Sequence, residues 1–206
     1  MTQPLVIACG ALTREIRAVL GQRGLTQSVE VLYLPANLHN RPDQIVPKIE
    51  PLLAEAVEQR RDVFIGYADC GTGGHLDALL DAYPGVERLL GAHCYEVIAG
   101  PEEFARMSDE ALGTFYLTDF LARSFEVLIW QGLGMDRHPE LKDMYFGNYE
   151  KLVLLSQSAN QEVLDAAKAA AERLGLELVI KEVGHVNMER AVPVEFGRPK
   201  HREVSV

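Results

Sequence analysis

Residues 63–74 read Val-Phe-Ile-Gly-Tyr-Ala-Asp-Cys-Gly-Thr-Gly-Gly, an apolar run that passes directly into a glycine-rich turn. The run predicts a buried strand over 62–67, and the residues that follow the turn predict a short helix that ends near Leu80. A strand, a tight turn and a helix in this order form the repeating unit of α/β folds. This stretch therefore sets the expected fold class.

Strand and helix patterns alternate on both sides of this unit. The other predicted strands cover 4–9, 28–34, 87–92, 114–117, 151–156 and 176–183. The predicted helices cover 11–23, 43–59 with a kink or a late start near Pro47, a segment after Cys94, 101–107, 118–130, a segment after Pro139, and 160–174. The alternation predicts a mostly parallel, Rossmann-like open sheet with helices on both faces.

The domain organisation follows from the same alternation. We expect a single α/β domain over 1–192, with possible sub-halves 1–100 and 101–192, and a polar tail over 193–206. No repeat and no linker interrupts the pattern, so one compact unit is the simplest interpretation.

Composition limits the possible partners. Of the 206 residues, 48% are hydrophobic and 24% are charged, as in ordinary globular proteins, and the net charge is −10. That charge argues against nucleic acid and against an anionic membrane as partners, because phosphate groups attract clustered Lys and Arg. The N-terminus enters a strand directly, and no apolar run approaches the roughly 20 residues of a membrane span. We therefore expect a cytoplasmic protein.

The three cysteines all lie where a predicted strand ends: Cys9, Cys70 and Cys94. Because parallel strands end at one edge of a sheet, we expect the three thiols to meet at one place. A reducing compartment makes a structural disulfide a poor explanation. The alternatives are a single catalytic thiol and inert cysteines packed as small apolar residues.

A shared thiolate site would hold a soft metal centre. Thiolates favour zinc, copper(I) or iron–sulfur clusters, and the closely spaced cysteine pairs of structural zinc sites are missing. Three ligands leave one coordination position open, which favours a [4Fe–4S] cluster with one available iron over a three-cysteine zinc site. No nucleotide is expected, because the glycine turn lacks the Lys-Ser/Thr of a P-loop and the Gly-x-Gly-x-x-Gly pattern.

Other polar residues near these strand ends are candidates for catalysis or substrate binding. The candidate proton carriers are His39, Asp69, His93 and His138. The candidate substrate-binding residues are Gly10, Tyr67, Gly71, Thr72, Gly73, Gly74 and Arg137. Each has a structural alternative: ordinary turn chemistry for the glycine turn, and a solvated helix start for Arg137 and His138.

Several motifs occur together in a recognisable order. They are Ala8-Cys9-Gly10-Ala11-Leu12 with Glu15, His39-Asn40, the stretch from Gly66 to Gly74, His93-Cys94-Tyr95, the stretch 115–120 and the stretch 136–147. From about residue 5 to 160 the chain resembles the bacterial and archaeal family catalogued as domain of unknown function 1638. The usual family motifs are Cys-Gly-Asn-Gly and His-Asp-Cys, where this chain has Cys-Gly-Thr-Gly and His-Cys.

The resemblance implies that Cys9, Cys70 and Cys94 are the cysteine set of the family. Relatives are often encoded near corrinoid-dependent methyltransferases and one-carbon enzymes, which implies a role in methyl-transfer or corrinoid-linked metabolism. It assigns no activity to any residue.

Three functions remain open at this point. The first is an enzyme, a lyase, transferase or hydrolase, that uses an open-site cluster or zinc as a Lewis acid on a small molecule. The second is a non-catalytic accessory protein that delivers a metal, a cluster or a corrinoid to a methyltransferase or a corrinoid protein. The third is a transferase or hydrolase with a cysteine nucleophile and no metal.

Overall fold

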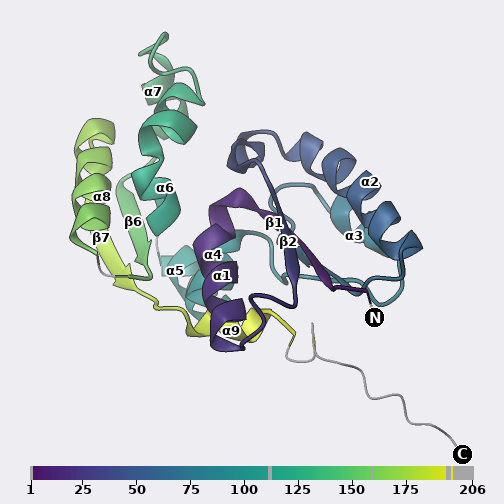
Figure 1. Ribbon diagram of the computed structural model, residues 1–206. Helices are drawn as coiled ribbons and strands as arrows, with labels where there is room; N and C mark the ends of the chain where they lie inside the picture. Colours follow the sequence, from purple (N-terminus) through teal and green to yellow (C-terminus); the bar gives the residue numbers. More distant parts are fainter. Residues whose placement is uncertain (1, 111–112, 159, 194–195, 197–206) are drawn as a thin grey trace, which may run out of the picture.

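The computed structural model describes residues 2–110, 113–158, 160–193 and 196. The fold class is α/β, as predicted, with every strand pair parallel (Figure 1). The strands divide between two sheets, however, instead of forming one. The predicted tail over 193–206 lies outside the described residues apart from Pro193 and Phe196.

The first sheet, sheet A, has the strand order β2-β1-β3-β4. Its strands are β1 (Leu5–Cys9), β2 (Glu30–Leu34), β3 (Val63–Gly66) and β4 (Glu87–Arg88). Ala8 is the register partner of both Tyr33 and Gly66, so the central strands end at one edge. The strand predicted over 87–92 is only two residues long, because Gly91 turns the chain with a φ of 103°.

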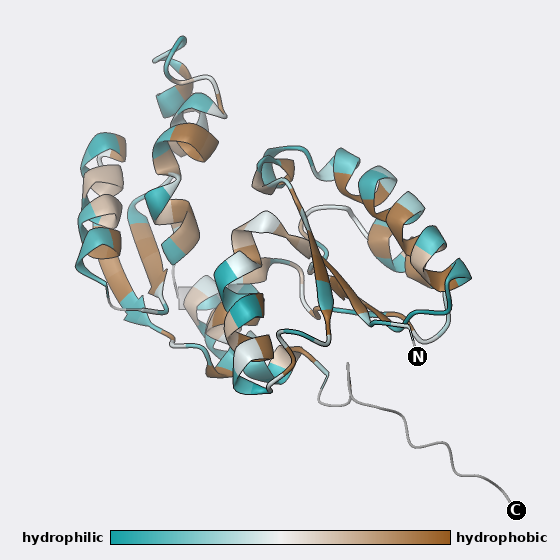
Figure 2. Ribbon diagram, viewed as in Figure 1, coloured by the Kyte–Doolittle hydropathy of each residue, from teal (hydrophilic) through white to brown (hydrophobic). Residues whose placement is uncertain are grey.

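Helices cover both faces of sheet A. They are α1 (Thr13–Gln22) and α4 (Cys94–Ala99) on one face, and α2 (Ile45–Glu58) and α3 (His75–Leu80) on the other. Successive residues of β1 alternate between these faces: Val6 packs in the core with α1, and Ile7 packs in the core with α2. The apolar side of α2 faces the sheet and its polar side faces outward (Figure 2).

The second sheet, sheet B, has the order β5-β6-β7. Its strands are β5 (Thr114–Thr118), β6 (Lys151–Ser156) and β7 (Glu177–Glu182). The helices α6 (Asp119–Arg123) and α8 (Gln161–Leu174) share a core with one face of this sheet. Of the two residues expected to cap this helix, Thr118 and Asp119, Thr118 caps α6. The expected continuous helix to 130 changes into a π-helix over Phe125–Gln131.

The two sheets share a hydrophobic core. Val153 and Leu155 of β6 belong to the same buried cluster as Val6 and Ala8 of β1. The helices α1 and α4 lie between the sheets (Figure 1), and α5 (Pro101–Glu110) follows α4 directly. These two consecutive helices separate β4 from β5 along the chain, so β5 begins a new sheet.

Two further helices complete the described part of the chain. The helix α9 (Val186–Ala191), which the sequence pattern did not predict, packs on α1 and α4. The helix α7 (Leu141–Phe146) lies at the end of a segment that projects away from the central helices (Figure 1). None of the helices among the described residues combines the length and the apolar character that crossing a bilayer requires.

Candidate functional site

The structure brings the three cysteines to the carboxyl edge of sheet A. Cys9 is the last residue of β1, Cys70 lies in the turn after β3, and Cys94 is the first residue of α4. The Cys70 amide donates a hydrogen bond of 2.8 Å to the Ala92 carbonyl, which ties the turn to the segment before α4. The chain turns tightly after Cys9, since a Cβ on Gly10 would lie 2.9 Å from the Leu34 carbonyl oxygen.

The thiols interact electrostatically with one another. Burial raises the pKa of Cys9, Cys70 and Cys94. Burial first, and then charge on Cys9, raises the pKa of Cys70 to about 12, and charges on Cys70 and Cys9 add to the rise in the pKa of Cys94. The predicted convergence of three thiols therefore has a counterpart in the folded chain: each is within electrostatic range of another.

The thiols do not form a ready-made site for one ion. Within the described ranges, no group of three His, Cys, Asp or Glu side chains lies close enough to hold a single metal ion. All three cysteines are free thiols and are partly exposed. The arrangement is thus an open cluster of thiols at a sheet edge.

The glycine turn after Cys70 is built around Asp69. Its carboxylate accepts hydrogen bonds from the Thr72 hydroxyl (2.6 Å) and from the amides of Gly73 (3.1 Å) and Gly74 (2.9 Å). Burial acts to raise the pKa of Asp69, but these hydrogen bonds outweigh it and hold the pKa below its usual value. The Thr72 hydroxyl and the amides of Gly73 and Gly74 belong to residues that were predicted to bind substrate. In the structure these three groups donate to Asp69 and so shape the turn.

Two of the candidate histidines lie next to the cysteines. The rings of His39 and His93 lie 6.4 Å and 6.3 Å from the ring of Tyr95, which follows Cys94. Burial lowers the pKa of His39, and the neighbouring His93 lowers it further. His39 is therefore neutral near pH 7, the state in which an imidazole accepts a proton. The His93–Cys94–Tyr95 segment and the loop after β2 meet here.

Tyr67 lies beside Cys9. Its side chain is 1% exposed, and its hydroxyl has no well-formed hydrogen bond among the described residues. Burial and then the neighbouring Cys9 raise the pKa of Tyr67. It therefore stays protonated and offers a buried donor next to a thiol.

The remaining sequence candidates lie elsewhere. Arg137 and His138 have side chains that are 73% and 61% exposed, and each faces an acidic neighbour, Asp136 and Glu140. No described contact joins them to the cysteines. They stand in the segment that leads to α7, so the structure does not bring them to the sheet edge.

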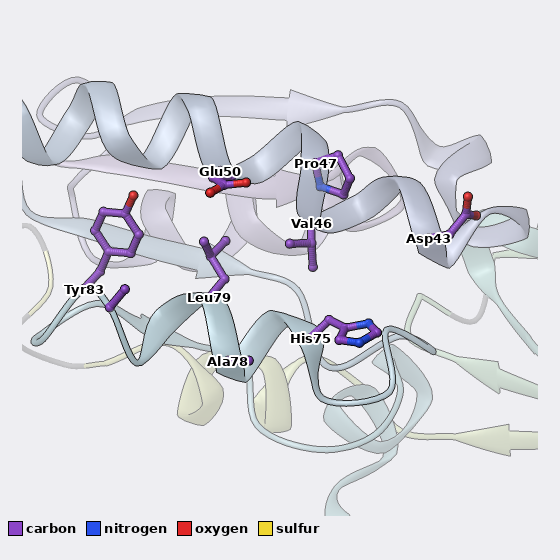
Figure 3. Close-up of a pocket in the computed structure, with 9 residues that line it drawn as sticks. Asp43, Val46, Pro47, Glu50, His75, Ala78, Leu79 and Tyr83 are labelled. Carbon is purple, nitrogen blue, oxygen red and sulfur yellow. The ribbon is translucent and has the colours of Figure 1, made fainter.

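The surface also carries grooves away from the cysteines. One lies between α2 and α3, where His75, Glu50 and Tyr83 line it (Figure 3). Another lies among α4, α5 and α9, where Leu90 and Glu96 line it. Neither groove includes a cysteine.

Sequence reasoning missed a second group of polar residues at the edge of sheet B. Asp119, Gln157 and His185 each follow a different strand. Asp119 and His185 lie within electrostatic range of Glu15 of α1, and the Gln157 backbone amide donates a hydrogen bond to Asp119. The signal that would have found them is the rule used for the cysteines, applied to the strands over 114–117, 151–156 and 176–183. Glu15 carries its own signal, because it is an acid among the buried Leu12, Ile16 and Val19.

Comparison with known proteins yields a family and nothing more specific. Neither the curated proteins nor the solved structures include a match to the chain. The profile of a family described as "Protein of unknown function (DUF1638)" matches residues 33–192, a range that includes Cys70 and Cys94 and begins after Cys9. Because this match spans well over half of the 206 residues and confirms the resemblance seen in the motifs, the chain belongs to the DUF1638 family.

Proposed function

We propose that Cys9, Cys70 and Cys94 hold a [4Fe–4S] cluster that leaves one iron open to a small molecule. The observation that carries the proposal is the placement of all three thiols at one sheet edge, within electrostatic range of each other. A single zinc ion needs its sulfurs about 2.3 Å from one centre. In a cluster each thiolate binds a different iron, so the sulfurs stand farther apart, which suits thiols that form no ready-made single-ion site.

The charges around the thiols support a metal centre over a metal-free nucleophile. Only the thiolate form of cysteine is a strong nucleophile or a ligand, and burial raises the pKa of all three cysteines here. A bound metal centre supplies the positive charge that deprotonation of buried thiols requires. Without such a charge these thiols stay protonated near pH 7.

The residues around the thiols have defined parts in this proposal. A cluster with an open iron supplies a Lewis acid that polarises a bound oxygen. His39, which is neutral near pH 7, accepts or returns a proton beside His93 and Tyr95. The Asp69 turn holds Cys70 in place. We place this chemistry in the cytoplasm and, on the strength of the family resemblance, in corrinoid-linked or one-carbon metabolism.

Anaerobic purification followed by an absorption spectrum and iron and sulfide analysis tests the proposal. We expect a brown protein with about four irons per chain. Each of Cys9→Ser, Cys70→Ser and Cys94→Ser should lose most of the iron while circular dichroism shows a folded protein, and His138→Ala should keep it. Stoichiometric zinc, or no metal after anaerobic reconstitution, would contradict the cluster.

A non-catalytic accessory role is a second candidate, and one observation favours it. Leu90, four residues before Cys94, is 81% exposed, as expected of an apolar contact for a partner protein. A carrier should give up its centre to a chelator during gel filtration, whereas an enzyme should retain it. Leu90→Ser should leave the iron content unchanged. If the chain is a carrier, the same substitution should slow transfer of the metal centre to an acceptor protein.

A further inference from the structure

A group of polar residues lies where the strands of sheet B end. Asp119 follows β5, Gln157 follows β6, and His185 lies three residues beyond β7. Glu15 joins them from α1, which lies between the two sheets (Figure 1). Ligands of parallel α/β proteins bind at this edge of the sheet. We call these four residues the sheet B site.

Asp119 is the fixed centre of the sheet B site. Its carboxylate accepts hydrogen bonds from the backbone amides of Gln157 (3.1 Å) and Ser158 (3.1 Å) and from the Ser158 hydroxyl (2.5 Å). The carboxyl group of Glu15 lies within electrostatic range of Asp119, His185 and Arg123. The four residues are thus neighbours although they come from four separate segments of the chain.

Other polar atoms of the site have no partner. Glu15 is 4% exposed and Gln157 is 7% exposed. Over the described ranges, Glu15 Oε2, both polar atoms of the Gln157 side-chain amide and His185 Nδ1 have no hydrogen-bond partner. A buried polar group without a partner is destabilising, and native proteins leave few of them unsatisfied. A polar ligand at this strand edge would supply the partners that these atoms lack.

The chemistry of these groups indicates the ligand. Glu15 and Asp119 contribute two carboxyl groups against the one guanidinium of Arg123, so the site favours a cationic group. The side-chain amide of Gln157 offers a donor and an acceptor side by side, which suits a carboxylate or a carboxamide. We propose that the sheet B site binds a small α-amino acid, with its ammonium group on Glu15 and its carboxylate on Gln157. This proposal goes beyond the cysteine chemistry and stands without it.

Thermal unfolding and calorimetry with the standard amino acids, each at 10 mM, test the proposal on the full chain. A ligand whose concentration is 100 times its Kd, as 10 mM is for a Kd of about 0.1 mM, stabilises a protein by about 2.7 kcal/mol. At least one amino acid should therefore raise the Tm by about 5–10 °C. The matching α-hydroxy acid and N-acetyl amino acid should not, because each lacks the ammonium group. Glu15→Gln and Gln157→Ala should each weaken binding at least tenfold, and His138→Ala should leave it unchanged.

The outcomes separate this site from the cysteine site. Amino-acid binding should persist in Cys70→Ser protein, even if that protein holds no iron. Two variants guard against misfolding, since either Glu15→Gln or Gln157→Ala alone is sufficient if the other fails to fold. The proposal is overturned if no amino acid shifts the Tm, if the hydroxy acids shift it equally, or if the folded variants bind as the wild type does.

Discussion

At Cys70 the backbone adopts a left-handed conformation, with a φ of 51°, that most side chains avoid. The amide hydrogen bond to Ala92 and the turn around Asp69 hold it there. A residue other than glycine pays a steric penalty of about 1–2 kcal/mol in this region. The thiol side chain is thus kept at a position where glycine would be more stable, as happens at functional sites.

This strain gives a prediction for two variants of Cys70. Cys70→Gly relieves the steric penalty, although the more flexible unfolded chain offsets about 0.5–1 kcal/mol of the gain. We expect Cys70→Gly to be more stable than Cys70→Ala by about 0.5–1 kcal/mol in urea unfolding. Under the proposed cluster, neither variant should hold iron. Equal stability, or a less stable glycine variant, would show that the left-handed backbone is not a cost here.

Glu15 gives a prediction about pH. Burial, and then charge on Asp119, raises its pKa above the usual 4.5. A raised pKa in the folded state stabilises the protein below the unfolded value, and this stabilisation is lost as the pH rises through the folded value. Glu15→Gln should therefore match the wild type near pH 4 and be more stable by about 1 kcal/mol at pH 8.

Unfolding in urea at several pH values, without added ligand, measures this difference. Asp165→Asn, a change of an exposed acid on α8, is the matched control and should show no such trend. Stability curves of wild type and Glu15→Gln that run parallel from pH 4 to pH 8 would contradict the prediction.

Among the helices, α8 shows how well the local sequence pattern predicts where a helix begins and ends. A helix over 160–174 stopped by Gly175 was predicted, and the observed helix covers Gln161–Leu174 with Gly175 in a left-handed conformation. The Asn160 side chain accepts a hydrogen bond of 2.8 Å from the Glu162 amide. The start and the end of α8 are both encoded in neighbouring residues, so no distant contact was needed to locate them.

The cap of α8 gives a prediction at this scale. Asn160→Ala removes the acceptor for the Glu162 amide and should cost about 1 kcal/mol, measured by chemical unfolding. Asn160→Asp keeps an acceptor and adds a charge that favours a helix N-terminus, so it should be at least as stable as the wild type. An alanine variant as stable as the wild type would mean that solvent replaces the cap without loss.

Other elements depended on distant contacts. The strand predicted over 87–92 shortens to two residues because the chain turns at Gly91 to meet the Asp69 turn. The predicted helix over 118–130 becomes a π-helix after Arg123, where the Asn40 side chain donates a hydrogen bond of 2.6 Å to the Leu128 carbonyl. In each case a residue far along the chain bonds to the backbone, which no local pattern can indicate.

The core shared by both sheets predicts that the molecule unfolds as one unit. Trp130 reports on the part of the chain that contains sheet B, and the three thiols report on sheet A. Trp130 fluorescence and thiol reactivity should therefore change at the same urea concentration. Leu155→Ala truncates a side chain in the shared core and should lower the free energy of unfolding by about 2–4 kcal/mol. Both midpoints should therefore move together to a lower urea concentration.

Val127→Ala is the matched control, because Val127 is 63% exposed and its truncation should change stability by less than about 0.5 kcal/mol. Two separate midpoints would indicate instead that 1–100 and 101–192 are independent domains.

The hydrophobic periodicity and the turn residues determined the α/β class, most helix and strand positions, and the placement of Cys9 and Cys70 at or shortly after strand ends. These depend on neighbours within a few residues, and the rule that parallel strands end at one edge extends them to the cysteines. Cys94 differs, because β4 ends at Arg88 and Cys94 begins α4. The division into two sheets and the approach of Glu15 to Asp119 and His185 were decided only in three dimensions. They depend on packing between segments that are far apart in the sequence, and the energy of such contacts leaves no periodic trace in the chain.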